Sequence, residues 1–158
     1  KWFWKGKEKE NIITSSQINV GSKESSISFH ENRMAEILRL HFGKNFFHDK
    51  HHDFLIGREN NRYRLDGLVD NDGIKFAVEI DGLQHFEYVP IFHKKGETDL
   101  ELQKKSDEEK NKLCEEANIP LVRIDSREWD GGEDSFWKLV LPELPDILCT
   151  RIRELIFD

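Results

Sequence analysis

Cysteine is scarce in this sequence and long apolar segments are absent, and both features limit the kind of protein that it can encode. The two cysteines, Cys114 and Cys149, stand far apart and form no Cys-x-x-Cys pair. This spacing argues against a disulfide framework and favours free thiols in a reducing, cytoplasmic environment. No stretch approaches the roughly 18 apolar residues of a membrane span, and the charged start KWFWKGKEKE has no apolar signal-peptide core. The sequence therefore predicts an intracellular protein with no membrane partner.

Positive charge is also in short supply. The 158 residues include 24 Lys and Arg against 31 Asp and Glu, which gives a net charge of −7. Because affinity for nucleic-acid backbones comes mainly from Lys and Arg, strong unaided binding to nucleic acid is not expected. The length fits one compact domain. We expect the mostly polar residues 1–26 to be an N-terminal arm or a linker remnant of a longer protein, and residues 27–158 to form the folded domain.

A glycine-rich phosphate loop is missing as well, and the segment GLVDNDG is instead a turn between two strands. Its dipeptide Asp72-Gly73 favours a two-residue hairpin loop, because both residues tolerate positive φ angles. Directly opposed residues in such a hairpin share a face of the sheet. Counting outward from the loop gives three opposed pairs: Asn71 with Ile74, Asp66 with Glu79, and Arg64 with Asp81.

The alternation of residue types along both strands agrees with this register. One face is apolar and is expected to carry Tyr63, Leu65, Val69, Ile74, Phe76, Val78 and Ile80. The other face gathers three carboxylates, those of Asp66, Glu79 and Asp81. Three acids this close repel one another unless a cation, a proton or an arginine is present. A hard divalent ion, Mg²⁺ by default, would relieve the repulsion; alternatively, Arg62 and Arg64 pair with these acids on a solvated face.

The residues that follow the hairpin suit chemistry on a phosphate. Imidazole titrates near neutrality, so His85 could take a proton from an attacking water while a metal polarises the phosphate. A structural histidine is the alternative. Gln84 could touch a phosphate or a base edge. In the segment FEYVPIFHKKGETDL, Lys94 and Lys95 alternate with aromatic residues, as in a nucleic-acid contact or a loop packed on the core.

A second histidine-rich segment, HDKHHDF, precedes the hairpin. Imidazole and carboxylate groups are zinc ligands, so a zinc site is conceivable there. The segment has no cysteine partners and no recognised spacing, and solvated histidines in a loop or strand edge are the favoured interpretation.

The order of the acids and the histidine resembles the PD-(D/E)xK nuclease superfamily. Asp66 followed by Glu79-x-Asp81-Gly82-x-x-His85 is closest to its very-short-patch-repair-like branch, which includes phage homing endonucleases with a Glu, Asp, His, Asp signature. The similarity extends from about Ser28 to Asp125. It implies a metal-binding Asp66 and a general base at His85.

The same resemblance implies two further catalytic residues, Glu36 on the first helix and Asp107 on a later one. One departure from the superfamily pattern is that Asp81 stands where a lysine is usual. A lysine could instead come from the helix, where Lys104, Lys105 and Lys110 are all candidates that the sequence does not distinguish.

The fold class expected from the pattern and the resemblance is α/β, with a restriction-endonuclease-like core in which helices flank a mixed sheet with an acidic hairpin. Ser28 and Glu31 form a capping-box pattern that predicts the start of the first helix. Further elements are expected at residues 100–117 (helix), 121–124 (strand), 136–141 (helix) and 146–157 (helix).

The function that the resemblance implies is that of a Mg²⁺-dependent endonuclease, with Mn²⁺ as a substitute, which cuts double-stranded DNA. A homing endonuclease is the leading interpretation; the alternatives are a mismatch-repair nicking endonuclease and an inactive DNA- or protein-binding module. Residues 27–158 would then be the nuclease domain, encoded by a phage or another virus. A homodimer would suit cleavage of both strands, and the negative charge suggests a DNA-recognition module outside this chain. The expected nucleic-acid contacts are Arg62, Arg64, Gln84, Lys94 and Lys95.

Overall fold

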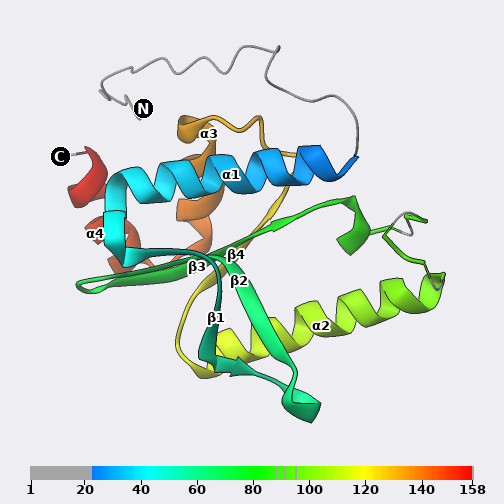
Figure 1. Cartoon of the computed structure of the whole chain (residues 1–158). Coiled ribbons are helices and arrows are strands. Elements are labelled where there is room, and N and C mark those ends of the chain that lie inside the picture. Colours follow the sequence, from blue (N-terminus) through cyan, green and yellow to red (C-terminus); the bar gives the residue numbers. More distant parts are fainter. Residues whose placement is uncertain (1–22, 88, 91, 95, 158) are drawn as a thin grey trace.

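The computed structural model describes residues 23–87, 89–90, 92–94 and 96–157, with the side chains of residues 23–28 and of Gln84 left aside. The Trp-Phe-Trp cluster and most of the expected N-terminal arm lie outside these residues. The main elements, in chain order, are α1 (Lys23–Phe42), β1 (Phe46–Ile56), β2 (Arg62–Asn71), β3 (Ile74–Asp81), α2 (Glu97–Glu116), β4 (Leu121–Asp125), α3 (Glu133–Val140) and α4 (Asp146–Phe157) (Figure 1).

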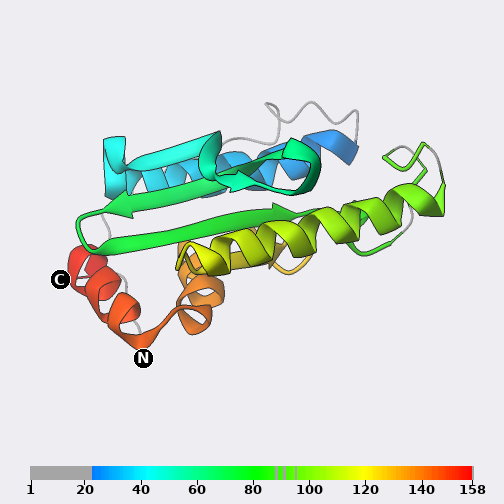
Figure 2. The ribbon, with the colours of Figure 1, turned by 90° about the horizontal axis from the view of Figure 1, so that it is seen from below.

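The strands form one mixed sheet in the order β1-β2-β3-β4. The first three strands are antiparallel, and β4 returns through α2 to lie parallel to β3. Figures 1 and 2 show α1 along one side of the sheet and α2 along the other. The expected mixed sheet with an acidic hairpin and flanking helices is therefore confirmed.

Two apolar clusters hold these layers together. The larger cluster joins α1, α3 and α4 to one face of the sheet, through residues such as Leu38, Phe76 and Phe136. The smaller cluster joins α2 to the opposite face and includes Leu65, Ala77 and Cys114. Both cysteines are buried free thiols. Because each face of the sheet is covered, its strands can carry apolar residues at consecutive positions.

The hairpin turn forms as expected. Asp72 and Gly73 have φ angles of 25° and 80°, and Asn71 pairs with Ile74. From there the β2–β3 pairing continues regularly to Gly67 opposite Val78. The register predicted from the turn is confirmed over this length.

Beyond Gly67 the regular backbone pairing with β3 ends, and the predicted pair of Arg64 with Asp81 does not form, because β2 leaves β3 and continues beside β1. Arg64 lies opposite His51 of β1 and not opposite Asp81. Tyr63 and Leu65 belong to the cluster on the α2 face, although the alternation predicted them on the face of Val69. The alternation therefore shifts by one residue between Leu65 and Gly67.

The helix boundaries differ from the sequence expectation by a few residues. α1 begins at Lys23, five residues before the capping box predicted at Ser28, so it crosses the expected boundary at residue 26. α2 ends close to the predicted position: Asn118 adopts a left-handed φ of 57° just after the helix, and Pro120 prevents its continuation. The expected strand at residues 121–124 and the helix at 146–157 are both present.

Candidate active site

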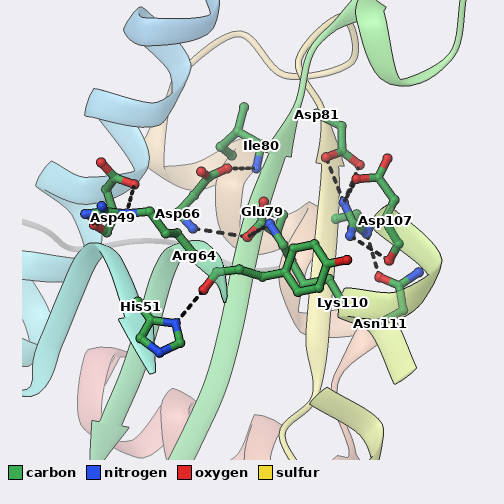
Figure 3. A network of polar contacts seen from close by, with 12 residues as sticks. Asp49, His51, Arg64, Asp66, Glu79, Ile80, Asp81, Asp107, Lys110 and Asn111 are labelled. Carbon is green, nitrogen blue, oxygen red and sulfur yellow. Dashed lines mark hydrogen bonds and ion pairs between the residues drawn. The ribbon is translucent and has the colours of Figure 1, made fainter. Parts of the chain in front are cut away.

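The site lies where β2 and β3 separate. There, two side-chain carboxylates accept the hydrogen bonds of backbone amides from the opposite strand. The Asp66 amide donates to Oε1 of Glu79 over 3.1 Å, and the Ile80 amide donates to Oδ2 of Asp66 over 2.8 Å (Figure 3). Each acid thus accepts a hydrogen bond from the other strand. The exchange holds Asp66 and Glu79 next to each other, as the hairpin register predicted.

Glu79 is buried and has a lysine beside it. Its side chain is 5% exposed, and Nζ of Lys110 lies 3.2 Å from its Oε1. The pKa of Glu79 is raised to about 8, mainly by burial and then by the charge of Asp66; Lys110 and Arg123 lower the pKa and offset only part of this rise. Of the three helix lysines that the sequence left open, Lys110 is therefore the one at the carboxylate pair.

Asp81 does not join Asp66 and Glu79. Its carboxylate accepts two hydrogen bonds from Nη1 of Arg123, at 3.0 and 3.2 Å. The three acids of the predicted acidic face are therefore not gathered at one point, because β4 places an arginine beside Asp81. Sequence analysis missed Arg123, although a cation at an alternating position of the apolar strand LVRID was a usable signal.

His85 and Asp107 lie within hydrogen-bonding distance of each other. His85 lies in the short 3-10 helix η4 (Leu83–His85), and its Nδ1 is 2.8 Å from Oδ2 of Asp107 on α2. Burial by itself lowers the pKa of His85, but the hydrogen bond to Asp107 and the charges of Asp81 and Asp107 outweigh it, so the pKa is raised. Burial alone would raise the pKa of Asp107; its hydrogen bond and attraction to His85 lower it on balance.

The structure does not bring Glu36 to these residues. Its side chain is 51% exposed and pairs with Arg33 over 2.5 Å. The acid of α1 that interacts with Asp66 is Glu31, whose pKa is raised by burial and then by the charge of Asp66. Oε1 of Glu31 also lies 3.0 Å from Nε2 of His48. Five residues turn a helix by about 500°, so Glu31 and Glu36 point about 140° apart.

The cations expected to touch nucleic acid are spread over the surface. Arg62 and Lys94 are exposed, and the guanidinium of Arg64 pairs with Asp49 at 3.2 Å. The side chain of Gln84 and the whole of Lys95 lie outside the described part of the chain.

Within the described residues, no group of three or more His, Cys, Asp or Glu side chains is arranged to hold a metal ion. The zinc site considered for HDKHHDF is therefore not formed; the segment lies in β1, where Nδ1 of His51 bonds the Tyr63 carbonyl.

Fold and site together define a mixed α/β domain with a partly buried cluster of acids and cations at the open end of a hairpin. The chain is 32% identical over 82 residues to uncharacterized protein 094L of Frog virus 3, and 30% identical over 66 residues to uncharacterized protein 307L of Invertebrate iridescent virus 6. These matches cover 44% and 42% of this chain. They span about half of the first relative (53%) and a third of the second (33%).

Both of these relatives are viral proteins, in agreement with the expected viral source. No family model matches the chain, and no solved structure matches it. Among the described residues, no helix is long and apolar enough to cross a membrane.

Proposed function

We propose that this chain is the catalytic domain of a Mg²⁺-dependent endonuclease that hydrolyses phosphodiester bonds in duplex DNA. In this proposal its sheet is a restriction-endonuclease-like core of the very-short-patch-repair-like branch of the PD-(D/E)xK superfamily. The observation that carries the proposal is the pairing of Asp66 with Glu79 at the point where the hairpin opens, with Lys110 beside the pair.

The carboxylate pair fits a magnesium ion. Mg²⁺ is usually held by one or two protein carboxylates, with water and substrate phosphate completing its shell, so a cage of three side chains is not required. Burial and then the charge of Asp66 raise the pKa of Glu79, and a divalent cation beside the pair would favour the ionised carboxylate. Mn²⁺ has the same ligand preference and is expected to substitute. When bound, the ion would polarise the phosphate.

The other residues have roles that follow from their contacts. With Nδ1 of His85 hydrogen-bonded to Asp107, Nε2 of the imidazole is the atom that would take a proton from water. Lys110 would stabilise negative charge beside Glu79. Glu31, which interacts with Asp66, replaces Glu36 as the acid that the first helix would contribute.

The wider setting is also part of the proposal. A homing-type endonuclease remains the leading specific form, with a mismatch-repair nickase as the alternative. The net charge of −7 favours a separate DNA-recognition module, and the partial coverage of the viral relatives leaves room for one. A homodimer would place two sites on opposite DNA strands. The buried free thiols suit a reducing, intracellular location.

The test is cleavage of supercoiled plasmid in Mg²⁺, Mn²⁺ or EDTA by the wild type, Asp66→Asn and His85→Ala. We expect metal-dependent nicking or linearisation that both substitutions reduce by at least about a hundredfold, the usual contribution of a general base. Glu36→Gln is the matched control, because its carboxylate pairs with Arg33 on the exposed side of α1. Cleavage at the wild-type rate by either site variant contradicts the assignment.

A second function is favoured by the partners that the acids already have. Lys110 and Arg123 form ion pairs with Glu79 and Asp81, as they would in an inactive DNA- or protein-binding module. Calorimetric titration with Mg²⁺ or Mn²⁺ separates the two functions. Metal binding that is lost in Asp66→Asn supports the nuclease even if the isolated chain does not cut plasmid. Indifference to both metals supports the binding module.

A further inference from the structure

Arg123 joins three parts of the site through a single guanidinium group. It lies on β4 opposite Glu79 of β3. Its Nη1 donates to both oxygens of Asp81, its Nη2 donates to the Asp107 carbonyl at 3.2 Å, and its Nε donates to Oδ1 of Asn111 at 2.7 Å. Figure 3 labels these three partners. The planar fork of an arginine suits such a set of acceptors, whereas a lysine would be a single point charge.

These contacts bear on His85 because two carboxylates face the same nitrogen of its ring. Nδ1 lies 2.8 Å from Oδ2 of Asp107 and 3.7 Å from Oδ1 of Asp81. An unpartnered Asp81 would compete with Asp107 for the Nδ1 proton, and the ring would then turn between two acceptors. Nη1 of Arg123 donates to both oxygens of Asp81 and also lies 3.6 Å from Oδ1 of Asp107. Oδ2 of Asp107 is therefore the carboxylate oxygen left at hydrogen-bonding distance of Nδ1.

We propose that Arg123 is a positioning residue that reserves Nδ1 of His85 for Asp107 by occupying Asp81, and so fixes the direction in which Nε2 points. Its hydrogen bonds described above reach neither Asp66 nor Glu79, although it lies opposite Glu79 and its charge lowers the pKa of that carboxyl. The inference rests on the proposed function for the role of His85 as a base. The hydrogen bond between His85 and Asp107 is nonetheless a property of the folded chain and can be measured without activity.

The experiment follows the Nδ1 proton of His85 by NMR in the full chain labelled with ¹⁵N-histidine. In the wild type we expect a sharp, downfield Nδ1 proton signal with a resolved nitrogen coupling. In Arg123→Gln we expect this signal to broaden or disappear. We also expect kcat for plasmid cleavage to fall about 10- to 100-fold with KM little changed, which is the usual effect of losing a group that orients a functional histidine. Arg127→Gln is the matched control, since Arg127 bonds Asp125 and covers Phe86, and it should keep the signal.

Two further variants separate positioning from a purely structural role. Arg123→Gln combined with Asp81→Asn removes the competing carboxylate together with its partner, so the Nδ1 signal should return. Arg123→Lys keeps the charge but cannot reach all the acceptors, and it should give a weakened signal; it decides the question if Arg123→Gln does not fold. A wild-type signal in Arg123→Gln or Arg123→Lys overturns the proposal, as does a signal that stays absent in the double variant. Failure of plasmid cleavage alone would count against the nuclease and not against the role of Arg123.

Discussion

Glu79 occupies a position that acids rarely take, inside the sheet and under a helix. A carboxyl whose pKa is about 8 in the folded protein, against an ordinary value of 4.5, holds a proton that the unfolded chain releases between these two pH values. The folded state therefore loses stability, relative to the unfolded state, as the pH rises through this window.

This leads to a prediction for Glu79→Gln, which removes the titrating group and keeps its shape. In EDTA the variant and the wild type should have similar Tm values at pH 5, and the variant should be the more stable at pH 9. Thermal unfolding at both pH values measures the difference. Added Mg²⁺ should raise the Tm of the wild type at pH 9 and leave the variant unchanged, because only a ligand that binds the folded state stabilises it. A Tm difference that does not depend on pH would mean that Glu79 is ionised throughout.

The site residues that could be predicted from sequence are those whose relative positions follow from local structure, such as a tight turn. Asp66 and Glu79 follow from a two-residue turn and the pairing of its strands. The resemblance assigned the acid of the first helix to Glu36, whereas the acid that interacts with Asp66 is Glu31. A family motif identifies the helix but does not specify which of its faces packs on the sheet. Arg123 and Lys110 reach the acids from 42 and 31 residues away, and no local pattern specifies which cation will arrive at which acid.

At the scale of elements, the departure of β2 from β3 is the feature that creates the site. Gly67 is the last paired residue before this departure, and it also lies directly beneath α1. A β-carbon at Gly67 would lie 2.8 Å from Sδ of Met34 and 3.0 Å from a ring carbon of Phe46. The close approach of α1 to β2 therefore requires a residue without a side chain.

Gly67→Ala tests this packing. Since the added methyl group must displace buried side chains, we expect a loss of about 1–3 kcal/mol in the free energy of unfolding, measured by urea denaturation. Metal binding by the folded variant should weaken too, because Gly67 adjoins Asp66. An unchanged midpoint would mean that α1 moves away from β2 at little cost.

Elements that depend on a few adjacent residues were predicted accurately, whereas positions that depend on contacts with distant parts of the chain were not. The turn at Asp72-Gly73, the end of α2 near Asn118 and the strand β4 depend on a few adjacent residues, and they lie where expected. The positions of Tyr63 and Leu65 depend on which neighbouring strand β2 follows, and that is decided by tertiary packing. Periodicity alone gives no sign of such a change of partner.

At the scale of the whole molecule, the excess of acidic residues limits the strength of the proposed binding to DNA. The net charge of the chain is −7. We expect the isolated chain to bind duplex DNA with a Kd no tighter than about 10⁻⁶ M at physiological salt, with little sequence preference. Fluorescence anisotropy between 50 and 200 mM salt, roughly the range in which backbone contacts are lost, measures both the Kd and its salt dependence. Tight, sequence-selective binding by this chain alone would remove the need for a separate recognition module.

The distance along the chain between the acids and their cations also has a consequence during synthesis. The hairpin leaves the ribosome with Asp66, Glu79 and Asp81 already in its strands, whereas Lys110 and Arg123 emerge later. Until α2 and β4 have been made, Glu79 lacks Lys110 and Asp81 lacks Arg123, and burying these two acids would be unfavourable. The nascent hairpin should therefore stay solvated and open, and the sheet should close around its acids only after translation has passed β4.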